Sequence, residues 1–235
     1  MSCEPPGEGR TVGTLNEKPL HAALKAWVAQ PGDRFEVAVA GYWVDIVRED
    51  LLIEIQTGNF AAIKGKLAAL AAQQPVRLVY PIAQEKWIVK LGGEGEGPLS
   101  RRRSPRRGTV EDLFGELVSF PRLLAQPNLT LEVLLIREEE VRRYEAGRRW
   151  RRGGWVTQER RLLEVVERRL FQTTADLAGL LPPMAADPFT TADLAAALRR
   201  PRRLAQQMTY CLREVGAIEP VGKQGKALLY RRATA

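Results

Sequence analysis

The sequence has very little cysteine and histidine, which excludes several kinds of site. Its 235 residues include two cysteines, Cys3 and Cys211, and one histidine, His21. Two cysteines so far apart make neither a disulfide framework nor a zinc site, and one histidine leaves no histidine-based metal cluster. Since a disulfide framework is the usual mark of a secreted protein, its absence leads us to expect a cytoplasmic location.

Long apolar runs are also missing. A membrane-spanning helix needs about 18 consecutive apolar residues, whereas the longest apolar stretches here are of the size of residues 67–72. The first ten residues, MSCEPPGEGR, lack the apolar core of a signal peptide. The composition, 45% hydrophobic and 27% charged, is that of a globular protein and excludes a collagen-like or wholly disordered chain. We therefore expect no membrane partner, and one large or two modest domains.

Positive charge is concentrated in the last third of the chain. Residues 1–147 contain 19 Lys and Arg against 20 Asp and Glu, whereas residues 148–235 contain 17 against 8. The net charge is therefore −1 in the first part and +9 in the second. Such a concentration usually indicates a polyanionic partner, most often nucleic acid, although it can also serve solubility alone.

The first 91 residues predict alternating helices and strands. Apolar residues recur at helical spacing before Pro31 and Gly32, which end the first helix. Alternating and β-branched residues predict the strands, and Asn59 is a plausible cap for the second helix. The expected elements are a helix at 16–29, strands at 34–40, 42–47 and 51–57, a helix at 59–74, and strands at 76–82 and 86–91.

The middle of the chain predicts a flexible loop and then a charged segment. Residues 92–108 are rich in Gly, Pro and Arg and cannot pack a core. The five arginines of this loop could hold phosphates, or the loop could be a solvated insertion. After a helix at 109–119 and a strand at 129–136, residues 137–155 carry glutamates four residues ahead of arginines, a favourable order on a helix surface. We place a domain boundary near Gly153 and Gly154.

The most informative stretch is residues 41–58, GYWVDIVREDLLIEIQTG. If residues 49–50 form the tip of a tight hairpin, Asp45 lies opposite Glu54. Side chains alternate between the two faces of a strand, so both carboxylates and Gln56 share one face. The hairpin offers no cationic partner on that face.

Opposed carboxylates need compensation, because like charges with Cβ atoms about 5 Å apart destabilise a strand pair. A Mg²⁺ or Mn²⁺ ion held by one or two carboxylates, waters and a substrate phosphate would supply it. Asp45 and Glu54 are therefore candidate metal ligands. The alternative is a solvated sheet face with scattered acids, since the spacing D-x8-E-x-Q is a short pattern.

The first helix supplies a third acid. Glu17 lies on the same helical stripe as Leu20 and Leu24, which predicts a side chain that points toward the core. Thr14 and Glu17 also match a capping box, which would explain Glu17 without chemistry. His21, one turn further on, is interpreted as a partly buried, hydrogen-bonded histidine rather than a catalyst.

Together these residues resemble the core of the PD-(D/E)XK nuclease superfamily. The resemblance covers residues 14–91: a helix with Glu17, a hairpin with Asp45, then Leu52-Ile53-Glu54-Ile55-Gln56 and an amphipathic helix. It implies an α/β domain over residues 14–152, with a restriction-endonuclease-like mixed sheet flanked by helices. It also implies that the two acids hold Mg²⁺ and that an activated water cuts phosphodiester bonds.

Two positions depart from the superfamily pattern. Val44 stands where proline is usual, and Gln56 stands where lysine is usual. Glutamine supplies no positive charge, although it can orient the attacking water through hydrogen bonds. In some members the lysine lies on the following helix. Here Lys64 is the candidate for that role and Lys66 the weaker one, unless both are ordinary surface lysines.

The segment 155–235 predicts a second domain. The expected elements are helices at 157–172, 190–198 and 201–216, and strands at 217–221 and 227–231. The order helix, helix, basic hairpin resembles a winged helix-turn-helix, whose second helix enters the major groove of DNA. Winged helices also dock proteins, but the arginine-rich face favours DNA. The expected DNA-binding residues are Arg202, Arg203, Gln206, Gln207, Tyr210, Arg213, Lys223 and Lys226.

The sequence therefore predicts a Mg²⁺-dependent DNA endonuclease or DNA-processing nuclease with a flexible N-terminus at 1–13. Glu17 and Gln56 would orient water, and Lys64 would supply positive charge near the scissile phosphate. The chain could also form a homodimer. The alternative is a catalytically inactive DNA-binding regulator that keeps the nuclease fold as a scaffold, which the glutamine favours. No residue excludes RNA as the substrate.

Overall fold

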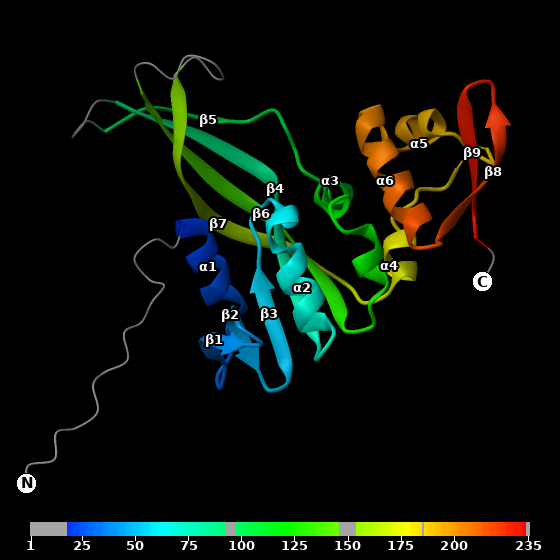
Figure 1. The fold of residues 1–235 in the computed structure, drawn as a ribbon. Coiled ribbons are helices and arrows are strands. Elements are labelled where there is room, and N and C mark those ends of the chain that lie inside the picture. The colour runs from blue at the N-terminus through cyan, green and yellow to red at the C-terminus, as the bar shows by residue number, and fades with distance from the viewer. Residues whose placement is uncertain (1–17, 93–96, 146–153, 185, 234–235) are drawn as a thin grey trace, which may run out of the picture.

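A long mixed sheet forms the body of the molecule. The computed structural model describes residues 18–92, 97–145, 154–184 and 186–233 (Figure 1). The strands of the sheet are β1 (Arg34–Val39), β2 (Tyr42–Arg48), β3 (Leu51–Ile55), β4 (Val76–Leu91), β5 (Pro98–Arg103), β6 (Leu129–Tyr144) and β7 (Trp155–Phe171). Their order is β1-β2-β3-β4-β6-β7, with β5 paired to β4 beyond the end of β3. The pairs β3–β4 and β4–β6 are parallel and the others antiparallel.

Helices flank this sheet, as the sequence predicts. On one face, Leu20 and Leu24 of α1 (Pro19–Val28) pack against Ile46 and Ile53. The other face carries a larger core beneath η1 (Phe60–Ile63), α2 (Lys64–Ala71), η2 (Val110–Leu113), α3 (Phe114–Leu117) and η3 (Pro121–Ala125). None of the helices in the described part of the chain combines the length and apolar character needed to cross a membrane.

The chain ends in a smaller unit of helices and one hairpin. Its elements are α4 (Thr174–Ala178), α5 (Thr191–Leu198), α6 (Arg202–Glu214), β8 (Ile218–Gln224) and β9 (Ala227–Arg232). Thr190 and Asp193 form a capping box at the start of α5, which explains why the helix begins there. Helix α6 is amphipathic and buries Leu204, Met208 and Leu212. An isolated bridge joins Phe189 to Tyr230 of the hairpin.

The predicted hairpin register is confirmed. In the ladder between β2 and β3, Ile46 lies opposite Ile53 and Arg48 opposite Leu51. The predicted strands at 76–82 and 86–91 are one long strand, because β4 continues through an irregularity between Ala83 and Glu85.

The largest correction concerns the charged segment after residue 136. Residues 137–144, whose charge order suits a helix surface, are instead the second half of β6, and the predicted helix at 157–172 lies in β7 up to Phe171. Residues 146–153 lie outside the described part of the chain. The Glu and Arg residues that could pair along a helix pair across strands, as Arg160 does with Glu138 and Arg168 with Glu132. Such a charge pattern is compatible with a helix or with a strand, and the pairing of β7 with β6 selects the strand.

The predicted flexible loop at 92–108 is also partly wrong. Residues 98–103 form β5, an edge strand on β4. Its arginines stabilise it, because Arg101 pairs with Glu139 and lies over the ring of Trp87. Cross-strand partners that are distant in sequence thus order a segment whose composition alone predicts flexibility.

The predicted domain boundary near Gly153 and Gly154 is wrong as well, because it falls between two paired strands of one sheet. Sheet and C-terminal unit also share one apolar core, in which Phe114 and Leu117 belong with Met208 and Leu212. A fragment ending at residue 154 would lose β7 and part of this core. Residue 154 therefore does not separate two domains that could fold independently.

Candidate functional site

The predicted acid pair lies where β2 and β3 separate. The Oδ2 atom of Asp45 accepts a hydrogen bond from the backbone N–H of Ile55 at 2.8 Å and lies 3.3 Å from Nε2 of His21 on α1. Burial alone would raise the pKa of Asp45, but the hydrogen bond and charge of His21, with that N–H, hold it below its usual value. Asp45 is therefore an ionised, fixed carboxylate.

Glu54 is the more deeply buried member of the pair, with 5% of its surface exposed. Burial, followed by the negative charge of Asp45, raises the pKa of Glu54 to about 7, although Lys66 opposes the shift. The Nζ atom of Lys66 lies 2.6 Å from Oε1 of Glu54 and also donates to the backbone carbonyl of Trp43. Lys66 is therefore the cation in contact with Glu54, and His21 is the partner of Asp45.

The lysine that contacts the acid pair is not the one that the sequence favoured. The sequence placed no cation beside the acids within the hairpin and favoured Lys64 from the helix, but Lys64 is exposed and Lys66 contacts Glu54. Residues 60–63 form a 3-10 turn, and α2 begins only at Lys64. Because a 3-10 turn has fewer residues per turn than an α-helix, the stripe that faces the sheet is shifted.

Gln56 has a local partner. Its Nε2 atom donates to the carbonyl of Gly58 and to that of Asn59 at 3.3 Å. The amide nitrogen therefore holds the turn after β3, so the expected role of orienting water would fall to the amide oxygen. Glu17, the predicted third acid, lies outside the described residues, as does the predicted flexible N-terminus.

Sequence reasoning missed one residue that reaches this end of the sheet. Arg160 of β7 donates to the carbonyl of Thr57 at 3.3 Å and pairs with the fully buried Glu138. It therefore ties the long strands to the turn after Glu54. No signal along the chain could show this, because the contact joins residues 103 positions apart and residues 157–172 predicted a helix.

Two carboxylates, one of them with a raised pKa, are a donor set suited to a hard divalent cation such as Mg²⁺. Among the described residues no group of three or more His, Cys, Asp and Glu side chains is arranged to hold a metal ion. Water and substrate phosphate would therefore have to supply most ligands, as is usual for Mg²⁺. The residues present therefore fit a metal site that the substrate phosphate and water complete, rather than one whose ligands all come from the protein.

The predicted DNA-binding residues divide into two sets. Arg202, Arg203, Gln206, Tyr210, Lys223 and Lys226 are exposed. Gln207 differs from the prediction, because it is half-buried with its side chain near Gly115 of α3. Arg213 is engaged locally, since it pairs with Glu214 at 3.0 Å and lies 5.7 Å from the centre of the Tyr210 ring.

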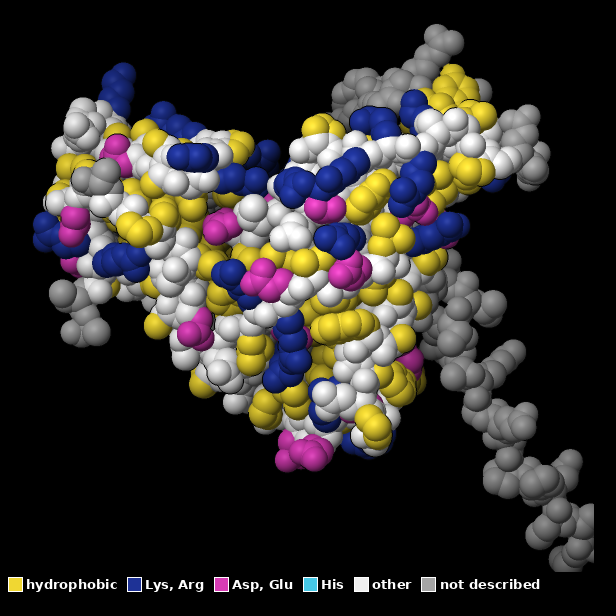
Figure 2. All heavy atoms as spheres, turned by 180° about the vertical axis from the view of Figure 1, so that it is seen from behind, with side chains coloured by type: hydrophobic (Ala, Val, Ile, Leu, Met, Phe, Trp, Pro, Cys, Tyr) yellow, Lys and Arg dark blue, Asp and Glu magenta, His cyan; other side chains and the backbone are white. Residues whose placement is uncertain are grey.

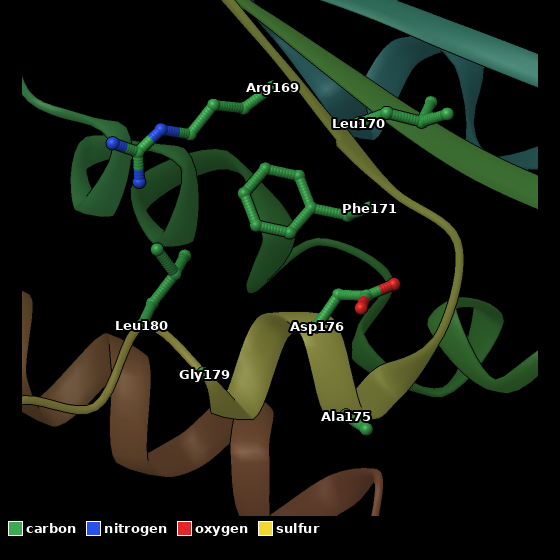
Figure 3. Close-up of a pocket in the computed structure, with 7 residues that line it drawn as sticks. All are labelled: Arg169, Leu170, Phe171, Ala175, Asp176, Gly179 and Leu180. Atoms are coloured by element: carbon green, nitrogen blue, oxygen red, sulfur yellow. The ribbon is translucent and has the colours of Figure 1, made fainter.

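A shallow hollow of about 550 Å³ lies elsewhere, where β7 passes into α4 (Figure 3). Phe171 and Leu180 form part of its wall, and Arg169 and Asp176 lie at its edge. None of the predicted site residues lines it. Asp176 is already used in the capping box of α4, so the hollow adds no reactive group.

Fold and site together define a mixed α/β protein in which half-buried Asp45 and buried Glu54 lie together, with Lys66 against Glu54. The chain belongs to a family described as "Domain of unknown function (DUF8091)", whose profile matches residues 18–172. An uncharacterized protein of Treponema pallidum (strain Nichols) is 30% identical over 226 residues, which cover 94% of this chain and 88% of that protein. No solved structure matches the chain. The matched segment ends next to the last residue of β7, in agreement with one continuous sheet.

The raised pKa of Glu54 predicts an unusual pH dependence of the free energy of unfolding in the metal-free protein. Its pKa is about 7 in the folded chain against an ordinary value of 4.5, so the folded state binds this proton more tightly than the unfolded state does. Its contribution is fully favourable below about pH 4.5 and is lost as the pH rises to about 7. Glu54→Gln, which mimics the protonated acid, should therefore raise the free energy of unfolding at pH 8 by up to about 3 kcal/mol.

Urea denaturation in EDTA tests this expectation at two pH values. The advantage of the glutamine variant should shrink toward zero at pH 5, where wild-type Glu54 is protonated. A variant less stable than the wild type at pH 8 would show that the Glu54–Lys66 ion pair outweighs burial.

Proposed function

We propose that this protein is a Mg²⁺- or Mn²⁺-dependent DNA endonuclease of the PD-(D/E)XK type that acts in the cytoplasm. The observation that carries the proposal is the pair of half-buried Asp45 and buried Glu54 on diverging strands, with Lys66 against Glu54. Helix, hairpin, strand and helix occur in the order that the resemblance requires. The cation would sit on these two acids and would supply positive charge at the scissile phosphate.

The chain's own residues would have separate tasks. The charge and hydrogen bonds around Asp45 keep it ionised, so it binds a cation at neutral pH without first losing a proton. Glu54 holds or releases a proton near pH 7. Lys66 places an ammonium group beside the acids, where it can contact a phosphate oxygen, which is the task that the missing lysine at position 56 would have had.

The C-terminal unit supports DNA as the partner. Helices α5 and α6 followed by the hairpin β8–β9, with the bridge from Phe189 to Tyr230, have the order of a winged helix. The exposed face of α6 begins with Arg202 and Arg203, which suit phosphates and base edges. We infer that this unit recruits the duplex.

A DNA-binding regulator without catalytic activity is the second candidate. The use of the Gln56 amide nitrogen in the turn favours it, because that group then does not assist a water molecule. The two candidates share DNA binding and differ in whether the acid pair takes up metal.

Metal binding separates the two candidates through thermal stability. Because a ligand that binds only the folded state stabilises it, Mg²⁺ or Mn²⁺ at 100 times its Kd should add about 2.7 kcal/mol. Differential scanning fluorimetry with and without the ion should show a higher Tm for the wild type and no shift for Asp45→Asn. Cleavage assays on supercoiled, linear, nicked and branched DNA, with RNA as a further substrate, complete the test. A shift that persists in Asp45→Asn would place the metal elsewhere.

A further inference from the structure

The arginines of this protein fall into two groups. Most arginines on the long strands have carboxylate partners, such as Arg137 with Glu164. Five exposed arginines lie in two short segments and have no ion-pair partner among the residues that the structure describes. These five, here called the junction surface, are Arg102, Arg106, Arg199, Arg202 and Arg203.

The two segments that carry the junction surface touch each other. Residues 102–107 comprise the end of the edge strand β5 and the loop after it, and residues 199–203 comprise the connection from α5 and the first two residues of α6. The guanidinium of Arg200 donates to the carbonyl of Arg107 at 3.3 Å and pairs with Asp112. The segment of the sheet that carries Arg106 and the segment of the C-terminal unit that carries Arg199 are therefore in contact.

The loop of the sheet is held firmly at this place. The backbone N–H of Gly108 donates to the carbonyl of Ala83 on β4 at 2.9 Å. A Cβ at position 108 would lie 2.6 Å from that carbonyl oxygen, so the close approach requires glycine. Arg106 and Arg107 thus extend from an anchored turn rather than from a free loop.

The junction surface borders the end of the sheet where the acid pair lies. Tyr80 of β4 packs edge-on against Phe60, which follows the turn after β3, with ring centres 4.8 Å apart. Burial and the charge of Glu116 raise the pKa of Tyr80 to about 12, while Arg160 and Arg106 oppose the shift. The backbone N–H of Gln56 donates to the carbonyl of Val79, and that of Gly108 donates to the carbonyl of Ala83, so residues 79–83 of β4 join the turn after Glu54 to the loop that carries Arg106.

The molecular surface is hollowed between the two units. Figure 2 shows a notch between the C-terminal unit and the long strands, with Lys and Arg side chains on both of its sides. Unpaired guanidinium groups are well suited to phosphate, because their planar fork can bind two phosphate oxygens at once.

We propose that the junction surface binds the phosphate backbone of one DNA duplex that lies across both units. Arg102 and Arg106 of the sheet would contribute to affinity along with Arg199, Arg202 and Arg203 of the C-terminal unit. This inference rests on the proposed function and adds to it the path of the substrate. Duplex binding is then shared between the units instead of belonging to the C-terminal unit alone.

The test measures duplex binding without cleavage. Fluorescence anisotropy in EDTA, with a labelled 30-base-pair DNA and the full chain, gives the Kd over a range of salt concentrations. Arg102→Ala with Arg106→Ala is compared with Arg202→Ala with Arg203→Ala. Arg34→Ala is the matched control, because Arg34 is also exposed but lies on β1, which β2 and β3 separate from β4, the strand that pairs with β5. Thermal melts verify that each variant is folded.

Both double variants should bind about 10- to 100-fold more weakly at 0.1 M salt, and their salt slopes should each fall by about 1.8, which corresponds to two lost phosphate contacts. The control should match the wild type. Wild-type affinity and slope in the Arg102 and Arg106 variant would overturn the inference while leaving the nuclease proposal intact. A wild type that binds the duplex as expected but cleaves no DNA in Mg²⁺ or Mn²⁺ would overturn only the catalytic proposal. Tighter binding of duplex RNA than of DNA, or no binding of either by the wild type, would also overturn the inference.

Discussion

Asp45→Asn and Glu54→Gln should each reduce metal-dependent cleavage by on the order of 10⁴-fold or more, the range seen when one member of a catalytic group is removed. Each substitution keeps the shape of the side chain and removes one negative charge from a pair that shares a buried site. The metal therefore loses a ligand while the strands β2 and β3 stay paired. Cleavage of supercoiled DNA, measured under single-turnover conditions, gives the rate.

The same hairpin offers matched controls for this experiment. Glu49 and Asp50 lie at its tip and are exposed, so Glu49→Gln and Asp50→Asn make the same chemical changes away from the acid pair. These controls should cleave at the wild-type rate. DNA affinity in EDTA should be unchanged or slightly higher in the two site variants, because an acid near the phosphates has been neutralised. A site variant that cleaves as fast as its control would remove Asp45 or Glu54 from the site.

Lys66→Ala should lower the cleavage rate by about 10²- to 10³-fold, the effect of removing one preorganised electrostatic group. Lys66 is the cation in contact with Glu54, at 2.6 Å, whereas Lys64 on the same helix is exposed. Lys64→Ala is therefore the matched control and should retain activity. Adding Gln56→Lys to the Lys66→Ala variant should recover part of the lost rate by returning a positive charge from β3.

A second measurement distinguishes a role in chemistry from a role in folding. Lys66 lowers the pKa of Glu54, so its removal should move the acidic limb of the pH–rate profile to higher pH. If Lys66→Ala only disturbed the packing of α2, the cleavage rate would fall at every pH and the acidic limb would stay at the same pH. Full activity of Lys66→Ala would indicate that the charge comes from another residue, such as Arg160 beside Thr57.

Local patterns in the sequence were sufficient for several elements. The first helix, the hairpin register and the second helix of the C-terminal unit follow from apolar spacing, turn residues and caps, which act between near neighbours. The pairing of Ile46 with Ile53 could be predicted because a tight turn sets the register of both strands. The proximity of Asp45 and Glu54 follows from that register.

Contacts between distant residues decided the rest. Residues 157–172 carry a pattern that satisfies a helix or a strand, and pairing with β6 selects the strand. Residues 98–103 become ordered only because β4 and Glu139 are beside them.

The sequence alone determined several local elements, an acid pair on one hairpin and a positively charged C-terminal third. These properties depend on residue type and on neighbours along the chain. Only the tertiary structure decided that Lys66 rather than Lys64 reaches Glu54, that one core joins the sheet to the C-terminal unit, and that Arg200 contacts the backbone at Arg107. The physical reason is that each depends on the phase of a helix or on the packing of segments far apart in sequence, which no local preference specifies.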